Sequence, residues 1–218
     1  CKTFAGAHNK TSAGGEISVL DPGGYGSVTI GKSLSLVADG TEGGILAAAA
    51  TGIIVNALAT DNVVISGLLL EGAGTGIRGI RIVSAKSVHI RDCVIRNFRG
   101  NPGIAIDIAP SAADVTVFVS NCTIEHNQNG IVATPTGAGV NANVFLDRVR
   151  ISKLTVGAGV GDAITANANS VIRINRSVVT NTTNAFKTAG NGSIISLQSN
   201  AVAGNTGVQN PSSTTPLK

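Results

Sequence analysis

Short stretches in which apolar and polar residues alternate run along almost the whole chain. Residues 15–37 contain the first of them, where ISVL, VTI and LSLV carry an apolar residue at every second position. Such alternation is typical of strands with one buried face. Segments rich in Gly, Asn and Asp separate the stretches and leave no room for a crossover helix. The pattern therefore predicts many short strands that are joined by turns.

Six segments of the chain share one nine-residue outline, and VISGLLLEG (64–72) is the first of them. The aliphatic residue at its second position reappears after 25, 29, 27, 28 and 23 residues, and these residues are Ile65, Ile90, Val119, Leu146, Ile174 and Leu197. A second register, often introduced by Gly, lies between the copies of this outline. Its members are GIIVNA (52–57), GIRIVS (79–84), GIAIDI (103–108), GIVATP (130–135), DAITAN (162–167) and NAFKTA (184–189).

A stack of coils explains these repeats, because one repeat cannot bury its own apolar side. We therefore expect an all-β fold, a right-handed single-stranded parallel β-helix of about seven coils. A left-handed form would need a near-hexapeptide repeat, and a β-sandwich would not place matched residues at a recurring interval. We expect a capping helix in residues 1–13 and the solenoid in 14–207. Residues 208–218 are then a tail, a linker or a segment folded over the last coil.

Two cysteines occupy matched positions of the outline. Cys93 and Cys122 share an inward row with Leu68 and Val149, so both thiols are expected to be buried and reduced. A disulfide is the less favoured alternative, since stacked residues keep their Cβ atoms near the coil spacing of about 4.8 Å and a disulfide needs about 3.8 Å. Cys1 stands apart from this row.

Composition excludes several classes of protein. Apolar residues make up 43% of the chain, which is not a disordered composition, and no apolar run reaches the length of about 18 residues that a membrane span requires. A net charge of +4 without a basic, aromatic-rich stripe predicts no nucleic-acid partner. The chain opens at Cys1 without Met, so we expect a processed or truncated N-terminus with any signal peptide upstream.

The N-terminal motifs carry a resemblance to known proteins. CKTF (1–4), AGGEI (13–17) and LDPGGYG (20–26), followed by GTGIRGIRI and KSVHIRDCVIRNF, resemble a group of secreted bacterial right-handed β-helix repeat proteins of the pectate-lyase-like superfamily, most of them uncharacterised. The resemblance implies this fold and a secreted, periplasmic or cell-surface location. It implies no activity.

Charged residues form one outward row on successive coils. Glu71, Arg96 and Glu125 alternate acid, base and acid, which predicts a structural ladder of ion pairs. The two glutamates lie two coils apart, about 9.6 Å on the usual strand spacing. Calcium needs all its ligands within about 2.6 Å of the ion, so this row does not fit a pectate-lyase-like calcium site.

No pair of carboxylates suggests hydrolysis of a glycoside. The chain has no two adjacent acidic residues, as an inverting polygalacturonase-like site would need. Asp107 is expected between Val83 and Thr134 of the neighbouring coils, and Asp162 is expected to cap a turn. None of the three histidines has a plausible catalytic partner. The interpretation leans against an enzyme, and we expect no metal and no cofactor.

A last outward row offers a candidate binding surface. His89, Phe118, Phe145 and Arg173 occupy matched positions on four consecutive coils. Two exposed rings beside cations could contact a sugar or a partner. The favoured expectation is nevertheless that a neighbouring loop or the C-terminal segment covers the two rings. We therefore favour a secreted, non-catalytic solenoid that acts as a binding or structural surface protein, with a polysaccharide or another protein as its partner. The alternatives are a divergent polysaccharide lyase or glycoside hydrolase, and the stalk of a larger adhesin or oligomer. The oligomeric state is open.

Overall fold

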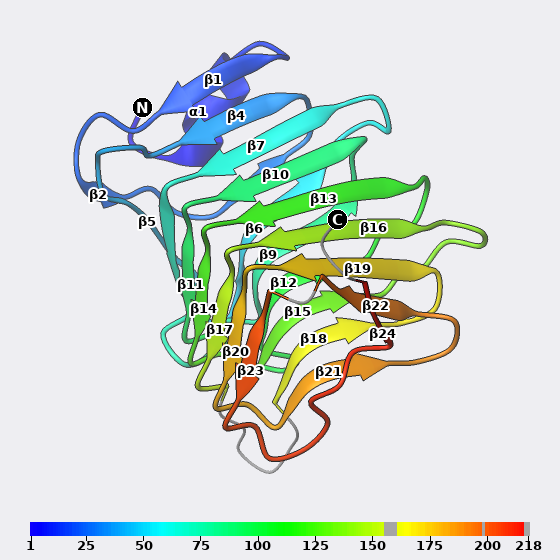
Figure 1. Cartoon of the computed structure of the whole chain (residues 1–218). Helices are drawn as coiled ribbons and strands as arrows, with labels where there is room; N and C mark the ends of the chain where they lie inside the picture. Colours follow the sequence, from blue (N-terminus) through cyan, green and yellow to red (C-terminus); the bar gives the residue numbers. More distant parts are fainter. Residues whose placement is uncertain (155–160, 198, 216–218) are drawn as a thin grey trace.

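The chain winds into a right-handed parallel β-solenoid (Figure 1). The computed structural model describes residues 1–154, 161–197 and 199–215. In Figure 1 the chain runs to the left along one sheet and returns to the right along another as it descends. All strand pairs within the three sheets of the described residues are parallel. This architecture confirms the all-β fold expected from the repeats.

Sheet A is the longest of the three sheets, with nine strands. In stacking order its strands are β1 (Gly15–Ser18), β4 (Leu34–Val37), β7 (Asn62–Ser66), β10 (Ser87–Arg91), β13 (Val115–Ser120), β16 (Ala142–Asp147), β19 (Ser170–Asn175), β22 (Ser193–Ser196) and β24 (Ser213–Thr214).

Sheet B follows sheet A in every coil and has eight strands. They are β2 (Gly23–Gly24), β5 (Gly43–Leu46), β8 (Leu68–Glu71), β11 (Val94–Arg96), β14 (Thr123–Glu125), β17 (Arg150–Ser152), β20 (Val178–Thr180) and β23 (Ala201–Ala203).

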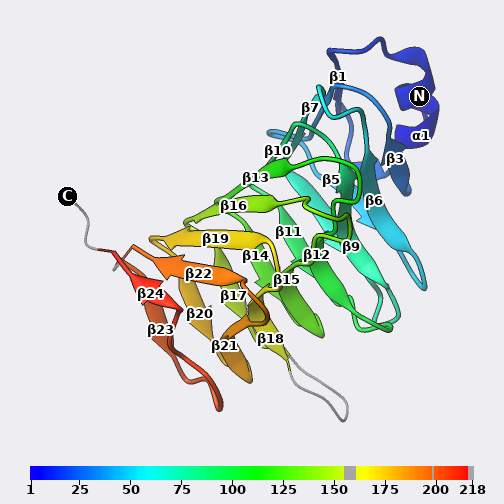
Figure 2. The same cartoon turned by 90° about the vertical axis from the view of Figure 1, so that its right-hand side faces the viewer.

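Sheet C closes each coil and has seven strands, which are visible along the length of the solenoid in Figure 2. They are β3 (Val28–Ile30), β6 (Thr51–Asn56), β9 (Arg78–Ser84), β12 (Ile104–Ile108), β15 (Asn129–Ala133), β18 (Asp162–Ala166) and β21 (Asn184–Thr188). The stack amounts to about six turns, close to the seven coils expected.

A helix covers the first coil. Helix α1 (Phe4–Lys10) begins after Thr3, whose side chain accepts a hydrogen bond from the N–H of Gly6 at 3.0 Å. Phe4 is buried, and its ring stacks on Tyr25 with centroids 4.9 Å apart. At the other end of the solenoid, β24 pairs with β22 and adds a short strand to sheet A. Among the described residues, no helix is long and apolar enough to cross a membrane.

One residue in the left-handed backbone region makes each corner between sheets A and B in the central coils. Asp92, Asn121, Arg148 and Arg176 have φ values of 56°, 52°, 53° and 46°, and Gly67 takes the same place one coil earlier with a φ of 73°. A left-handed residue reverses the side-chain direction within one position, so the strands before and after it can both point apolar residues inward. This corner keeps the coils in register.

The inward rows of the core are those that the repeats indicate. Ile65 pairs with Ile90, and the row continues through Val119, Leu146 and Ile174, all of them buried. In the last coil the strand pairing differs from the expected alignment by one residue, because Ser196 lies opposite Ile174. Leu197 is outside this row, although it lies at the position that the repeat pattern favoured. The pairing of Ile172 with Ile194 continues directly into this register.

Sheet C requires a second correction. Ile80 pairs with Ile106, two residues beyond the position that alignment on the glycines indicates. Asp107 therefore lies between Arg81 and Val132, and not between Val83 and Thr134. A shift of two residues leaves the inward and outward faces unchanged, so the alternation of apolar and polar residues cannot reveal it.

Candidate functional site

The predicted binding row forms a continuous stack on the outer face of sheet A. His89 of β10 stacks on Phe118 of β13, with ring centroids 4.6 Å apart and 15° between the planes. Phe118 stacks on Phe145 of β16 at 5.1 Å and 13°. The guanidinium carbon of Arg173 on β19 lies 5.2 Å from the centre of the Phe145 ring. The four side chains are thus brought together in the order expected.

This stack presents ring edges to solvent, because each ring face contacts the next side chain along the row. Phe118 and Phe145 are each 36% exposed, so the expectation that a loop or the C-terminal segment covers them is wrong for the described part of the chain. The geometry removes the possibility that a sugar lies flat on the face of Phe118, since His89 and Phe145 occupy its two faces. A ligand would contact the edges of the rings and the rows beside them.

Polar rows flank the stack on both sides. Ser87, Thr116 and Asn143 pair in register on one side. Arg91, Ser120 and Asp147 pair on the other side, where the carboxylate of Asp147 accepts two hydrogen bonds from Arg176 at 2.8 and 2.6 Å. The outer face of sheet A therefore combines an apolar central stripe with hydroxyl, amide and charged groups at the spacing of the coils.

Burial shifts the titration of the histidine in this stack. Partial desolvation lowers the pKa of His89 from its ordinary value of 6.5, and the nearby positive charge of Arg91 lowers this pKa further. His89 is consequently neutral at pH 7, and its contact with Phe118 is one between two uncharged rings. Arg173 is therefore the positively charged side chain of this stack.

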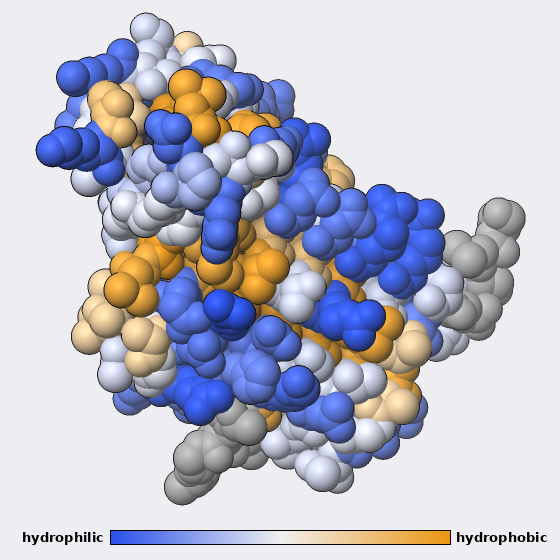
Figure 3. All heavy atoms as spheres, turned by 90° about the vertical axis from the view of Figure 1, so that its left-hand side faces the viewer, coloured by the Kyte–Doolittle hydropathy of each residue, from blue (hydrophilic) through white to orange (hydrophobic). Residues whose placement is uncertain are grey.

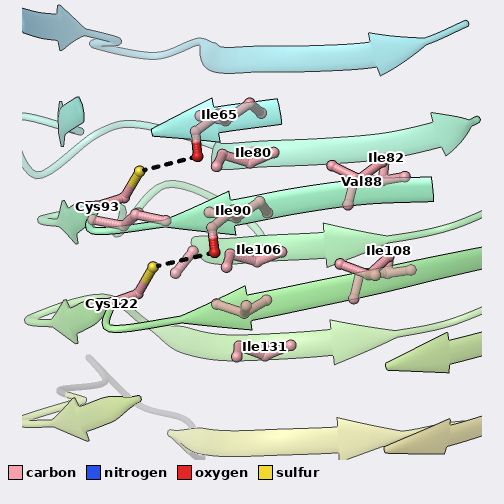
Figure 4. Packing of buried hydrophobic residues seen from close by; sticks show 14 of the residues in the cluster. Ile65, Ile80, Ile82, Val88, Ile90, Cys93, Ile106, Ile108, Cys122 and Ile131 are labelled. Atoms are coloured by element: carbon pink, nitrogen blue, oxygen red, sulfur yellow. Dashed lines mark hydrogen bonds between the residues drawn. The ribbon is translucent and has the colours of Figure 1, made fainter. Parts of the chain in front are cut away.

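The two cysteines pack among the buried aliphatic side chains of the solenoid, on successive coils (Figure 4). Both are free and only 1% exposed. The Cys93 thiol lies 3.9 Å from the carbonyl oxygen of Ile65, and the Cys122 thiol lies 3.8 Å from that of Ile90. The neighbouring Cys122 thiol and burial raise the pKa of Cys93. These contacts give the thiols a packing role.

The charged row on sheet B forms only one of its two expected ion pairs. Glu71 accepts a hydrogen bond from Nε of Arg96 at 2.9 Å, and the strands place Arg96 in register with Glu125. Glu125 lies instead 3.8 Å from Nδ1 of His126, and no Arg96–Glu125 contact within 4 Å occurs among the described residues. The expected ion pair between Arg96 and Glu125 is therefore wrong, because the guanidinium of Arg96 turns toward Glu71.

An open groove lies at the first coils of sheet B (Figure 3). Its volume is about 470 Å³, and Pro22, Gly24, Leu46, Leu69 and Glu71 are among its lining residues. Leu46 is exposed, and Gly24 and Gly44 leave the floor without side chains. None of the residues of the sheet A stack lines this groove.

Sequence reasoning missed a charge cluster on the outer face of sheet C. Nε of Arg78 lies 2.6 Å from Oδ2 of Asp107, and Nε of Arg81 lies 3.6 Å from the same oxygen. The Asp107 side chain is only 7% exposed. On β18, Asp162 forms a separate ion pair with Lys187 at 2.7 Å. The two-residue shift in sheet C hid the first cluster, because it brings Arg81 next to Asp107.

Buried asparagines are another feature that the repeats did not reveal. Asn127 accepts a hydrogen bond from the N–H of Phe98 at 2.9 Å and donates one to the carbonyl oxygen of Ile95 at 2.9 Å. Asn205 makes the same two kinds of bond with Thr182 and Val179. The sequence signal that could have indicated these side chains is an Asn directly after the outline in two repeats. These side chains satisfy main-chain groups at the corner between sheets B and C.

Metal binding receives no support from the described residues, because no group of three or more His, Cys, Asp or Glu side chains in them is placed to hold an ion. The carboxylates of Asp107 and Asp162 are each paired with a cation. The three outer faces present aromatic edges, hydroxyl and amide groups, guanidinium groups and carboxylates such as that of Glu125.

Comparisons with known proteins agree with the architecture. No family model matches the chain, and no curated protein matches it. Among solved structures, a pectate lyase, Pel9A, superposes with a TM-score of 0.58 over 96% of this chain and 73% of that chain, at 13% identity. At this identity the likeness concerns the fold alone. The chain therefore has the parallel β-helix fold of the pectate lyases.

Proposed function

We propose that this protein is a non-catalytic solenoid that binds a polysaccharide on the outer face of sheet A. The observation that supports this proposal is the exposed stack of His89, Phe118, Phe145 and Arg173 across four consecutive coils. A stack with only a structural role would be more stable if a loop covered it, because covering removes apolar ring surface from water. Its exposed edges, flanked by polar rows, are typical of a surface that contacts an amphipathic polymer.

Binding along this face follows from the coil spacing. A polysaccharide running parallel to the solenoid axis would place its C–H groups against the edges of Phe118 and Phe145. Its hydroxyl groups would reach Thr116 and Asn143 on one side and Ser120 on the other, which lie in register with the rings. Each contact is weak because the face is open to water, so affinity depends on many contacts along one chain. Polymers should bind better than short oligosaccharides.

The location proposed for this activity is the secreted, periplasmic or cell-surface environment that the N-terminal resemblance implies. A polymer-binding surface is useful where polysaccharides occur, and an open sheet face allows a long chain to enter and leave from the side. The fold itself accommodates such a chain without any closed pocket.

Affinity gel electrophoresis tests the proposal, with pectin, polygalacturonate, alginate and neutral glycans in the gel and with or without Ca²⁺. Retardation by at least one polymer is expected. Phe118→Leu removes the ring and should weaken retardation severalfold. Thr116→Arg should weaken retardation as well, because it leaves the rings in place but obstructs the face. The matched control is Leu46→Ala, which removes an exposed apolar side chain from sheet B.

Three outcomes contradict this proposal. Absence of retardation by every polymer overturns carbohydrate binding, and equal weakening by Leu46→Ala overturns its assignment to sheet A. Release of unsaturated or reducing ends during the same incubations overturns the non-catalytic interpretation and favours the lyase or hydrolase alternative.

A further inference from the structure

Among the buried side-chain nitrogen and oxygen atoms of the described residues, Nε of Arg81 is the one without a hydrogen-bond partner. This nitrogen lies 3.6 Å from Oδ2 of Asp107, beyond hydrogen-bond distance. The same oxygen already accepts a hydrogen bond from Nε of Arg78 at 2.6 Å. A buried donor without an acceptor is costly and calls for a ligand, a water molecule or an ion at the site.

The backbone holds both arginines on one outer face. Arg78 and Arg81 lie three positions apart on β9, and two consecutive residues between them, Gly79 and Ile80, are buried. This departure from simple alternation turns both guanidinium groups outward over sheet C. Asp107 on β12 then lies beside both, because it pairs in register with Arg81.

Charge at this cluster is unbalanced. Two guanidinium groups share one carboxylate, so the cluster carries a net charge of +1. The side chains are 22% exposed for Arg78 and 40% exposed for Arg81, which leaves them partly desolvated yet open on one side. Within the residues that the structure describes, the terminal nitrogens of neither arginine donate to a protein acceptor.

We propose that Arg78 and Arg81 form a binding site for a compact oxyanion such as a carboxylate or sulfate group. A guanidinium presents parallel N–H donors that match two oxygens of such a group, and partial desolvation strengthens the attraction. Asp107 acts as the positioning residue, since its carboxylate accepts a hydrogen bond from Nε of Arg78 and attracts the guanidinium of Arg81 at 3.6 Å. The bound oxyanion accepts hydrogen bonds from the terminal nitrogens, which have no protein acceptor among the described residues, and it neutralises the excess charge.

The oxyanion has two sources with the same chemistry. It is either a free small anion or a group attached to a polymer. This site lies on sheet C and the aromatic stack lies on sheet A, so the inference does not depend on the proposed function. Loss of one kind of binding leaves the other unaffected.

Nuclear magnetic resonance of the arginine Nε–Hε groups tests the site in the intact protein. Sodium sulfate and sodium acetate are titrated at constant ionic strength, with sodium chloride as the balancing salt. We expect saturable shifts of the Arg78 and Arg81 resonances and none at Arg150, a partner-free arginine of sheet B by the contacts described. A linear drift at all three arginines would overturn the proposal.

Variants separate a shaped site from general attraction of charge. Arg81→Gln should lower sulfate affinity at least tenfold, and Arg150→Gln should leave it unchanged. Arg81→Lys keeps the charge but loses the planar donors, so it should also lose most of the affinity. Sulfate binding by Arg81→Lys equal to that of the native protein would refute the site. Circular dichroism of each variant verifies folding, and the titration of the native protein stands even where a variant fails to fold.

The source of the oxyanion is read from the same resonances. Shifts with polygalacturonate but not with fully methyl-esterified pectin at concentrations where acetate is ineffective indicate a group on a polymer. Equal affinity for acetate and for the carboxylates of polygalacturonate indicates a free anion. Shifts with both pectins alike would contradict recognition of an oxyanion.

Discussion

The side-chain oxygen of Asn127 accepts a hydrogen bond from the N–H of Phe98, a residue 29 positions earlier, at 2.9 Å. The amide group of Asn127 donates to the carbonyl oxygen of Ile95. One side chain thus satisfies two main-chain groups inside the solenoid, where water cannot replace it. The side chain is fully buried.

Asn127→Ala should therefore lower the free energy of unfolding by more than the loss of side-chain volume alone would. Two main-chain groups would lose their partners, and each buried unsatisfied group costs about 1–3 kcal/mol. Urea unfolding measures the change. Asn143→Ala, on the half-buried outer face of sheet A, is the control and should change the free energy of unfolding by about 0.5 kcal/mol or less. Equal effects of the two substitutions would refute the role given to Asn127.

A glycine at the start of β15 is required by close packing between coils. A Cβ atom at Gly130 would overlap the main-chain oxygen of Ala163 on the next coil. Gly130→Ala should destabilise the protein by about 1–3 kcal/mol, the usual cost of overpacking a core.

The control for this substitution is Gly24→Ala, because a Cβ atom at Gly24 meets nothing within 4 Å. This change should be neutral or stabilise by about 0.4–1 kcal/mol, because alanine restricts the unfolded chain. Thermal unfolding compares the two variants. A larger loss at Gly24 than at Gly130 would show that the coils pack differently.

Thiol reactivity should distinguish the three cysteines. Cys1 is exposed, and Cys93 and Cys122 are buried and free. The thiolate is the reactive form, and the raised pKa of Cys93 disfavours it. In a titration with Ellman's reagent, one thiol per chain should react in the native protein and three in guanidinium chloride. Two fast thiols in the native protein, or only one in denaturant, would contradict the packing role.

The histidine of the aromatic stack should make stability depend on pH. Desolvation, with a contribution from Arg91, lowers the pKa of His89 below 6.5 in the folded protein, so the unfolded chain binds a proton at a higher pH than the folded chain does. Stability is therefore retained above pH 6.5 and falls as the pH is lowered through 6.5 toward the folded-state pKa.

The measurement compares the native protein with His89→Gln by urea unfolding between pH 5 and pH 8. The native protein should lose more stability than the variant on acidification, and proton resonances should assign His89 a pKa below 6.5. A pKa above 6.5 would mean that Phe118 stabilises the charged imidazole.

Much of the fold and part of the candidate site follow from the sequence, because a solenoid repeats its requirements in every coil. The rows that contain Ile65, Cys93 and Phe118 could each be located from matched positions. The strands pair the rows of Ile65 and Phe118 as expected over the central coils, and Cys93 and Cys122 are buried as expected. The order of side chains in the aromatic stack follows from this register alone.

Other features depended on the tertiary structure. The register of sheet C was decided by turns of unequal length between sheets B and C, and a slip of two residues preserves the apolar face, so alternation does not exclude it. That slip brings Arg81 beside Asp107. Whether the face or the edge of a ring meets solvent, and whether Arg96 turns toward Glu71 or Glu125, likewise depends on the packing of neighbouring coils. The sequence by itself determined which residues share a row in sheets A and B of the central coils, because the period of the coil is written in it. The tertiary structure decided which atoms meet across rows, because those contacts join side chains whose separation no local pattern encodes.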